Sequence, residues 1–185
     1  NGDSVGDLFI GASGASVEQL DNRGKAYLFF GSPARLNGSV TDLSSASADC
    51  TLWGADPGDR LGHAVAMPRI FSSQYADLAV SALRAFEETG DPEKDRWLGS
   101  WGAIYVVRGR AEFPERIDFS FERADVTIFG ATNGDAFGYQ LAAGRILGAS
   151  RDDLAATTFR AERTPRLSDE GVAVIFPSAS LSESA

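Results

Sequence analysis

The residues with the clearest potential for chemistry are three aspartates that recur in one sequence context. Asp7, Asp77 and Asp153 are each followed by Leu and a short apolar run, at intervals of 77 − 7 = 70 and 153 − 77 = 76 residues. Carboxylates supply the hard oxygen atoms that a cation such as Ca²⁺ requires. They also pair with guanidinium groups through charge-assisted hydrogen bonds, so both interactions are considered for these three aspartates.

No residue pattern in the chain predicts catalysis. His63 is the only histidine, and it begins an expected strand at a position where the internal repeat has Tyr139, so we expect a structural role. The sequence lacks a nucleophile elbow, a phosphate-binding glycine loop and a His or Cys cluster at metal-ligand spacing. Cys50 is the only cysteine and is expected to be a small buried side chain. We therefore expect a protein that is not an enzyme.

The composition fits a soluble globular protein. The 185 residues are 43% hydrophobic and 23% charged, which is enough to bury a core. With 17 Lys and Arg against 26 Asp and Glu, the net charge of −9 disfavours binding to nucleic acid or to anionic membranes. The apolar runs are too short to cross a bilayer, so we expect no membrane span.

Short apolar segments that recur along the chain predict strands. The Gly-Lys-Ala-Tyr-Leu-Phe-Phe-Gly segment at 24–31 matches segments at 102–109 and 171–177, and the segment at 50–63 matches 126–139. β-Branched and aromatic runs bounded by Gly, Asp, Asn and Pro are typical of an all-β fold. The repeat predicts ten strands in a cycle of four, at 7–12, 25–30, 51–53, 62–67, 77–82, 103–107, 126–129, 138–143, 153–157 and 172–176.

The repeated motifs resemble the FG-GAP repeat of integrin α-subunit β-propellers and of many bacterial surface proteins. Gly-Asp-Ala-Phe-Gly at 134–138 and Gly-Asp-Arg-Leu-Gly at 58–62 are similar to its Gly-Asp-x-Phe-Gly turn, and Gly-Ala-Ser at 11–13 is similar to its Gly-Ala-Pro. The resemblance implies a partial β-propeller of about two and a half four-stranded blades. Residues 1–60 would form strands 2–4 of one blade, 61–136 a complete blade, and 137–185 strands 1–3 of a third.

The same resemblance implies a degenerate calcium site in the first loop. In the family, the loop that ends in Asp-Leu binds Ca²⁺ through oxygens at its first, third, fifth and ninth positions. The matching residues here are Asn1, Asp3 and Asp7, at the third, fifth and ninth positions. The alternative is a solvated acidic turn without metal.

The other two loops carry arginine where the family has its first ligand. Arg69 precedes Asp77, and Arg145 precedes Asp153, with apolar residues at the third positions. A guanidinium could reach the closing carboxylate through paired hydrogen bonds. We therefore expect salt bridges Arg69–Asp77 and Arg145–Asp153 in place of the cation, with two unrelated surface arginines as the alternative.

Recognition is expected to involve the long connections that follow each Asp-Leu strand. Trp97 and Trp101 lie among charged residues in one of them, and Arg160 and Arg163 lie in another. Such side chains are candidate anchors for a protein or a glycan, although the tryptophans could also pack the loop down. The expected function is a non-catalytic binding or adhesion module that is secreted, periplasmic or on the cell surface. The alternatives are a structural subunit that completes its sheet edges with other chains, and the accessory propeller of a larger enzyme.

Overall fold

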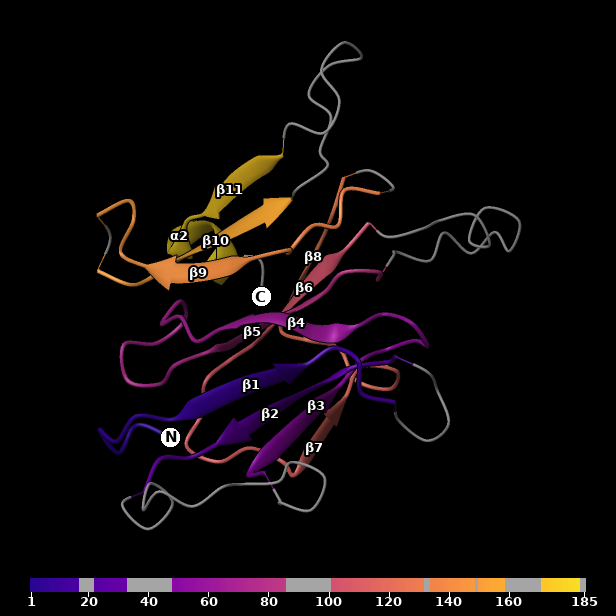
Figure 1. Ribbon diagram of the computed structural model, residues 1–185. Helices are drawn as coiled ribbons and strands as arrows, with labels where there is room; N and C mark the ends of the chain where they lie inside the picture. Colours follow the sequence, from indigo (N-terminus) through magenta and orange to yellow (C-terminus); the bar gives the residue numbers. More distant parts are fainter. Residues whose placement is uncertain are drawn as a thin grey trace.

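The chain folds into three β-sheets and one short helix in a computed structural model, which describes residues 1–16, 22–32, 48–85, 101–131, 134–148, 150–158 and 171–183 (Figure 1). The all-β expectation is confirmed. The elements are β1 (Leu8–Ala12), β2 (Lys25–Phe29), β3 (Cys50–Trp53), β4 (Leu61–Ala66), β5 (Leu78–Ala82), β6 (Ala103–Val107), β7 (Arg116–Asp118), β8 (Val126–Phe129), β9 (Leu141–Gly144), β10 (Asp153–Thr158), β11 (Val172–Phe176) and α2 (Ser178–Glu183).

The first sheet has the strand order β1-β2-β3-β7. Its first three strands are consecutive and antiparallel, whereas β7 runs parallel to β3, with Leu52 opposite Ile117. Because β7 comes from the connection between two strands of the next sheet, it crosses over to close the outer edge of this one. This strand was not predicted, because Arg116–Asp118 is short and lies outside the repeat.

The middle sheet has the order β4-β5-β6-β8, and the third sheet has the order β11-β10-β9. All pairs in both sheets are antiparallel. The four strands of the middle sheet lie within 61–136, the segment that was expected to form one complete blade. The third sheet has no fourth strand among the described residues, and the chain continues from β11 into α2, a helix that the sequence analysis did not predict.

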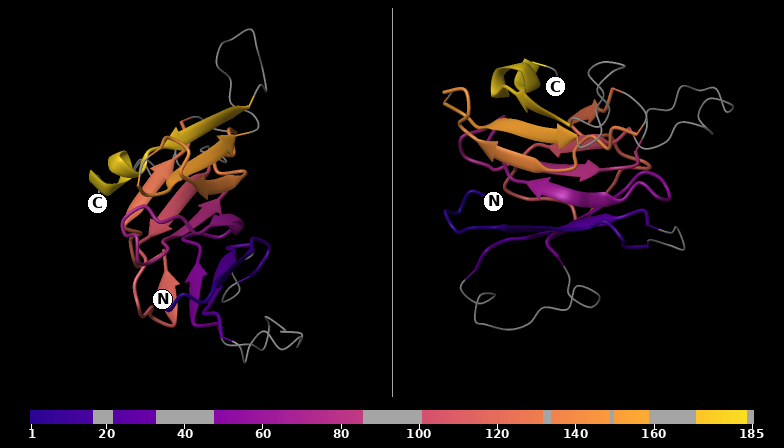
Figure 2. Two further views of the ribbon diagram at one scale, coloured as in Figure 1. Left: turned by 90° about the vertical axis from the view of Figure 1, so that its left-hand side faces the viewer. Right: turned by 45° about the horizontal axis from the view of Figure 1, so that its top comes forward.

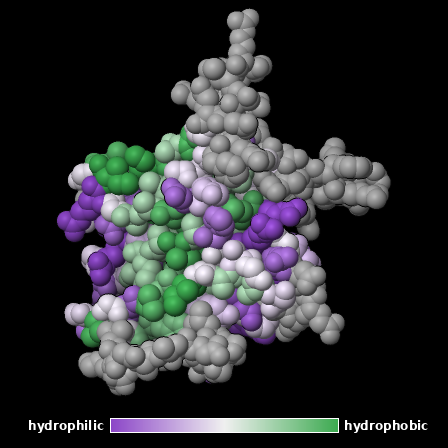
Figure 3. Space-filling view, viewed as in Figure 1, coloured by the Kyte–Doolittle hydropathy of each residue, from purple (hydrophilic) through white to green (hydrophobic). Residues whose placement is uncertain are grey.

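The three sheets stack face to face (Figure 2). One core fills the space between the first and middle sheets and includes Leu28, Leu52 and Val80. A second core lies between the middle and third sheets and includes Ile104 and Leu154, with Leu181 of α2 packed into it. The strands β1, β4 and β9 are each an edge strand of one sheet, and β4 lies between the other two and contacts both. A band of hydrophobic surface covers this region in Figure 3.

Matched glycines place the turns of each repeat in the same backbone conformation. Gly24, Gly102 and Gly171 precede β2, β6 and β11 and have φ angles of 81°, 78° and 68°. A Cβ atom on Gly24 would come within 2.3 Å of backbone atoms of Leu61, and one on Gly102 within 2.2 Å of the Phe137 carbonyl oxygen. Only glycine combines a positive φ with such close approach to another backbone. The repeat is thus visible in the backbone as well as in the sequence.

Nine of the ten expected strands appear within one residue of their expected ends, but β9 begins at Leu141 rather than at residue 138. Phe137 and Gly138 belong instead to the turn before β9, where Gly138 has a φ of 84°. α2 is the one helix in the described part of the chain, and it lacks the length and apolar character needed to cross a membrane.

Candidate functional site

The Asp77 carboxylate organises the loop that it closes. Its Oδ2 atom accepts hydrogen bonds from the backbone amides of Ile70 (2.7 Å) and Phe71 (3.1 Å). Its Oδ1 atom accepts one from the amide of Gly109 (2.7 Å), just after β6. The side chain is buried, and an ionised carboxylate that accepts several amide hydrogen bonds is strongly held. Asp77 therefore fixes both the start of its own loop and the end of the neighbouring strand.

The same arrangement recurs at the other two aspartates. Asp153 accepts hydrogen bonds from the amides of Ile146 (3.1 Å) and Leu147 (2.8 Å) and from that of Ser178 (3.0 Å), just after β11. Asp7 accepts one from the amide of Gly31 (2.9 Å), just after β2. The main-chain nitrogen of Asn1 lies 3.0 Å from Asp7 Oδ2. Asn1 is six residues before its aspartate, and the amides of Phe71 and Leu147 donate from the same position of their loops. Each of the three aspartates thus accepts a hydrogen bond from the amide just after the next strand and contacts the main-chain nitrogen six residues before it, and we call the three loops the aspartate loops.

The expected salt bridges Arg69–Asp77 and Arg145–Asp153 do not form. Both arginines are exposed, and neither takes part in an ion pair with a described residue. The reason is that three backbone amides already use both oxygens of each carboxylate. The residue pattern pointed to side-chain partners for the two aspartates, whereas the donors are main-chain amides, which every residue except proline carries.

The matched carboxylates Asp77 and Asp153 differ in their acidity. Burial raises the pKa of Asp77 above its ordinary value, against the opposing effect of the three amide hydrogen bonds. For Asp153 the amide hydrogen bonds from Leu147 and Ser178 prevail and lower the pKa. Because the donors are equivalent, the surroundings rather than the hydrogen bonds account for the difference.

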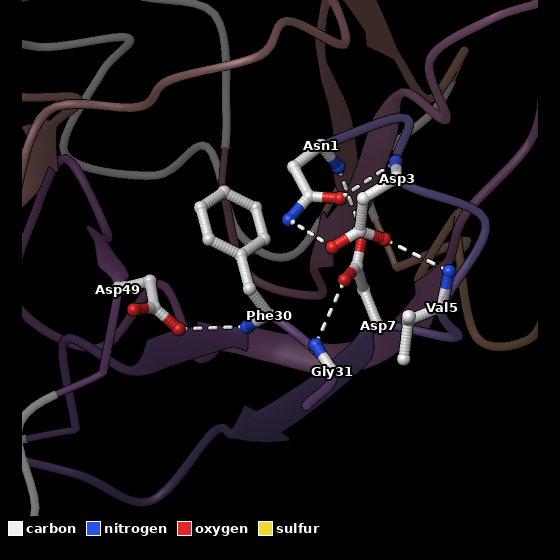
Figure 4. Close-up of polar contacts among 7 residues, drawn as sticks. All are labelled: Asn1, Asp3, Val5, Asp7, Phe30, Gly31 and Asp49. Carbon is white, nitrogen blue, oxygen red and sulfur yellow. Dashed lines mark hydrogen bonds and ion pairs between the residues drawn. The ribbon is translucent and has the colours of Figure 1, made fainter. Parts of the chain in front are cut away.

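The first aspartate loop contains the residues with oxygen ligands (Figure 4). Asp3 accepts hydrogen bonds from the Asn1 side-chain amide (3.0 Å) and the Val5 backbone amide (2.8 Å), and the Val5 bond is the main cause of its lowered pKa. Asn1, Asp3 and Asp7 all lie along this one turn. Their oxygens are of the hard type that Ca²⁺ prefers. Among the described residues, however, no group of three or more His, Cys, Asp and Glu side chains is placed to hold a metal.

The opposite ends of the sheets carry the Gly-Asp turns, and we call this end the turn face. The amide of Arg60 donates to the Asn22 carbonyl, and the amide of Arg84 donates to the Asp59 carbonyl. The turn at 58–60 therefore contacts the end of the connection before β2 and the start of the connection after β5. Asp59 is 3% exposed, and burial raises its pKa to about 6. The Asp59 side chain is thus buried within this turn, whereas Asp56, Pro57 and Arg60 are exposed.

A buried ion pair links the turn face to β7. The guanidinium of Arg23 donates to Asp118, to the Gly54 carbonyl and to the Ser120 hydroxyl, which is 2.8 Å away. Arg23 is 2% exposed and Asp118 4% exposed. The ion pair therefore ties the first sheet to a segment that comes from the middle repeat. Sequence reasoning missed it because Arg23 matches Trp101 in the repeat.

Of the residues expected to bind a ligand, Trp101 is the one in the described part of the chain. It is half-buried before β6, and its indole N–H is buried without a hydrogen-bond partner there. Trp97, Arg160 and Arg163 lie outside the described residues. The structure therefore does not bring the expected ligand-binding residues together.

A different aromatic residue stands out on the turn face. Phe121 is 87% exposed, more than any other large hydrophobic residue in the described ranges. It lies in the turn after β7, where its amide donates to the Asp118 carbonyl (3.0 Å). Because Phe119 bonds to Trp53 at the end of β3, this turn lies beside the start of the Gly-Asp turn. The clustering of Phe119 and Phe121 around Ser120 was the available sequence signal.

An open groove of about 530 Å³ lies between β4 and β9. The matched residues His63 and Tyr139 line it, with ring centroids 5.1 Å apart. Burial lowers the pKa of His63, so the imidazole is held toward its neutral form. His63 and Tyr139 thus pack on each other, which agrees with the structural role expected for His63.

No protein-family model matches this chain, and no curated protein sequence is similar to it. The FG-GAP resemblance stays a prediction from the motifs.

Proposed function

We propose that this chain is a segment of an FG-GAP-type β-propeller and serves as a non-catalytic, extracytoplasmic recognition module. The phased sequence motifs, the stacked sheets and the threefold aspartate-loop pattern support this assignment. The buried carboxylates of Asp77, Asp118 and Asp153 are engaged by backbone amides or by Arg23, so their role is to hold the scaffold. Recognition in such proteins is usually located in loops on a rigid scaffold.

The observation that carries the recognition role is the exposed Phe121 on the turn face. A fully exposed aromatic side chain costs solvation free energy unless a partner covers it, and aromatic residues dominate the binding energy of interfaces. The Arg23–Asp118 ion pair at the base of the same turn holds Phe121 on an ordered support. The turn face also carries the described ends, Ala85 and Trp101, of the connection in which Trp97 lies. A protein or glycan that binds there would contact Phe121.

A binding survey with matched variants tests this role. The chain is applied to immobilised glycans and purified extracellular matrix proteins, and retained ligands are measured again with Phe121→Ala, Trp97→Ala and Leu147→Ala. Leu147 is the control because it is also exposed, at 58%, but lies in an aspartate loop at the opposite end. We expect the Phe121 or Trp97 variant to lose at least tenfold in affinity and the Leu147 variant to bind normally. Equal loss in all three, or retention of no ligand, contradicts the proposal.

A second candidate function is assembly with further sheets, and one-sided burial favours it. Each position of β5 and β6 in the middle sheet is buried, whereas Leu8 of β1 is 54% exposed and Ile175 of β11 is 40% exposed. The outer faces of the first and third sheets are therefore open to a neighbour. The sedimentation coefficient of the chain over a concentration series tests whether copies associate, and a monomer at all concentrations argues against self-assembly.

We also propose that the first aspartate loop binds Ca²⁺ weakly. Asn1, Asp3 and Asp7 supply side-chain oxygens, and the charge of Asp3 is favoured by its lowered pKa. Thermal melting with and without Ca²⁺ tests this, because a ligand that binds only the folded state raises the melting temperature. The matched variant Asp3→Asn removes one charged ligand and should abolish the shift. A melting temperature that does not respond to Ca²⁺ refutes the site.

A further inference from the structure

Among the described residues, the third sheet has one strand fewer than the first and middle sheets. In the first sheet β3 pairs with β2, and in the middle sheet β8 pairs with β6, in both cases antiparallel. The matching strand of the third sheet is β11, which pairs with β10 on one side. No described strand pairs with its other side. β11 is thus an edge strand at a position where the repeat has an interior strand.

The backbone at the start of β11 has the conformation that receives a fourth strand. In the first two repeats the amide of Gly54 donates to the Gly24 carbonyl (3.2 Å), and that of Gly130 donates to the Gly102 carbonyl (2.9 Å). These bonds join the end of the fourth strand to the glycine before the third. Gly171 is the matched glycine and keeps the positive φ, at 68°. The third repeat therefore retains the acceptor, although no described residue donates to it.

The alternation of the antiparallel ladder identifies the free amides of β11. Because Gly102 bonds to Gly130, every second residue of β6 from Gly102 onward faces β8. The matched residues in the third sheet are Ala173 and Ile175, whose backbone groups face the open edge. Val174 faces β10, opposite Ala156.

The two existing fourth strands show what sequence fits this edge. Residues 49–54 read Asp-Cys-Thr-Leu-Trp-Gly, and residues 125–130 read Asp-Val-Thr-Ile-Phe-Gly. The leading aspartates accept hydrogen bonds from the amides of Phe30 (2.6 Å) and Arg108 (2.8 Å). The matched residue in the third repeat is Pro177, which has no amide hydrogen. The strand that fits β11 therefore needs the Thr-aliphatic-aromatic-Gly part of the pattern but not the aspartate.

We infer that the free edge of β11 binds an antiparallel strand of the type x-Thr-aliphatic-aromatic-Gly from a polypeptide outside residues 1–185. This inference rests on the assembly function proposed above and names its partner. Addition of a strand to an open sheet edge is an established mode of peptide recognition. This chain already does so internally, because β7 is recruited to the outer edge of β3. A second copy does not supply the strand from its own β3 or β8, because β3 is paired on both sides and β8 already uses for β6 the backbone groups that would face β11.

A peptide with the sequence of residues 124–131 (Ala-Asp-Val-Thr-Ile-Phe-Gly-Ala) is the probe, added to the complete chain. Hydrogen exchange of the individual amides is followed by NMR. At saturating peptide the amides of Ala173 and Ile175 are expected to exchange at least tenfold more slowly. The amide of Val174, which already pairs with β10, is expected to change less than twofold.

Two methylated peptides separate strand pairing from non-specific binding. Methylation of the Ile128 nitrogen removes a donor that faces the sheet edge, whereas methylation of the Thr127 nitrogen alters a donor that faces away. The first should reduce affinity at least tenfold and the second less than threefold. A third peptide with Asp125→Ala should bind within twofold of the parent, because Pro177 offers that aspartate no amide.

The inference is overturned if the amides of Ala173 and Ile175 gain no protection from hydrogen exchange at peptide concentrations up to about 1 mM. A dissociation constant above that value corresponds to a binding free energy weaker than about −4 kcal/mol. It is also overturned if both methylated peptides bind equally. Protection that appears with rising concentration of the chain alone would assign the edge to a second copy and overturn the stated partner. Sedimentation tests the assembly function separately, since association through the open sheet faces would persist when the peptide fails.

Discussion

The middle and third sheets have strands of similar composition but very different surroundings. β6 reads Ala-Ile-Tyr-Val-Val and is buried at every position, whereas β11 reads Val-Ala-Val-Ile-Phe and has Ala173 and Ile175 exposed. Hydrophobicity of the strand therefore does not decide its burial. The middle sheet has a neighbour on each face, and the third sheet has a neighbour on one. An apolar, non-alternating strand with one open face indicates where a neighbour belongs.

The aspartate loops repeat this contrast in their electrostatics. Asp77 and Asp153 accept matched amide hydrogen bonds, yet the pKa of Asp77 is raised and that of Asp153 is lowered. The contributions of Asp77 and Asp153 to stability therefore change with pH in opposite directions. The Asp77 contribution to stability is present at low pH and declines as pH rises through its folded pKa. The Asp153 contribution is present above the unfolded pKa and declines as pH falls through its folded pKa.

The largest expected effect concerns the closed edge of the first sheet, which the third sheet lacks. Asp118→Ala leaves the Arg23 guanidinium buried without its partner, so we expect a loss of about 3–5 kcal/mol in the free energy of unfolding. Urea unfolding measures it. Asp125→Asn is the control, because its ion pairs with Arg108 and Arg110 are partly exposed and about 1 kcal/mol is the most they should contribute. Equal losses in the two variants would show that β7 is not held by the buried pair.

The contrast in burial itself is tested by truncating one residue in each sheet. Ile104→Ala in β6 removes a fully buried side chain and should cost about 2–5 kcal/mol. Ile175→Ala in β11 removes a side chain that is 40% exposed and should cost about 1 kcal/mol or less. Urea midpoints of the two variants give the comparison. Similar losses at both sites would mean that the outer face of β11 is covered in solution.

The buried carboxylate of Asp59, in the turn before β4, is expected to make stability depend on pH. The pKa of Asp59 is raised to about 6, so its contribution is present below the unfolded value and is lost as pH rises through about 6. Asp59→Asn should remove this decline and gain about 1–3 kcal/mol relative to the parent between pH 4 and pH 7. Unfolding at a series of pH values measures the slope. Asp56→Asn controls for the loss of one charge in the same turn, and an identical change in slope would refute the assignment to Asp59.

The smallest effect is expected at the two arginines that sequence reasoning paired with the aspartates. Arg69→Met and Arg145→Met should each change the free energy of unfolding by about 0.5 kcal/mol or less, because exposed side chains outside ion pairs contribute little. The readout is the urea midpoint. A loss above about 2 kcal/mol in either variant would restore the salt bridge as the feature that holds the loop.

Most strand positions could be predicted from the sequence, because most strands carry β-branched or aromatic residues and are bounded by turn residues such as glycine. It could not reveal β7, since Arg116–Asp118 has no apolar alternation and takes its strand conformation from pairing with β3. The importance of Asp77 and Asp153 was visible, but their partners are backbone amides and were assigned wrongly to arginines. The Arg23–Asp118 ion pair was missed because the two residues lie far apart in the chain and Asp118 lies outside the repeat. Local patterns therefore predict elements, while contacts between repeats require the fold.

The crossover of β7 has a consequence for folding during synthesis of the chain. The first sheet is not complete until residues 116–118 leave the ribosome, after β4, β5 and β6 of the next sheet have been synthesised. Until then the outer edge of β3 remains open and Arg23 has no carboxylate partner. Long-range pairing of this kind slows folding and prolongs the exposure of an edge strand. A nascent chain arrested before Arg116 is therefore more prone to aggregate than one that has passed Asp118.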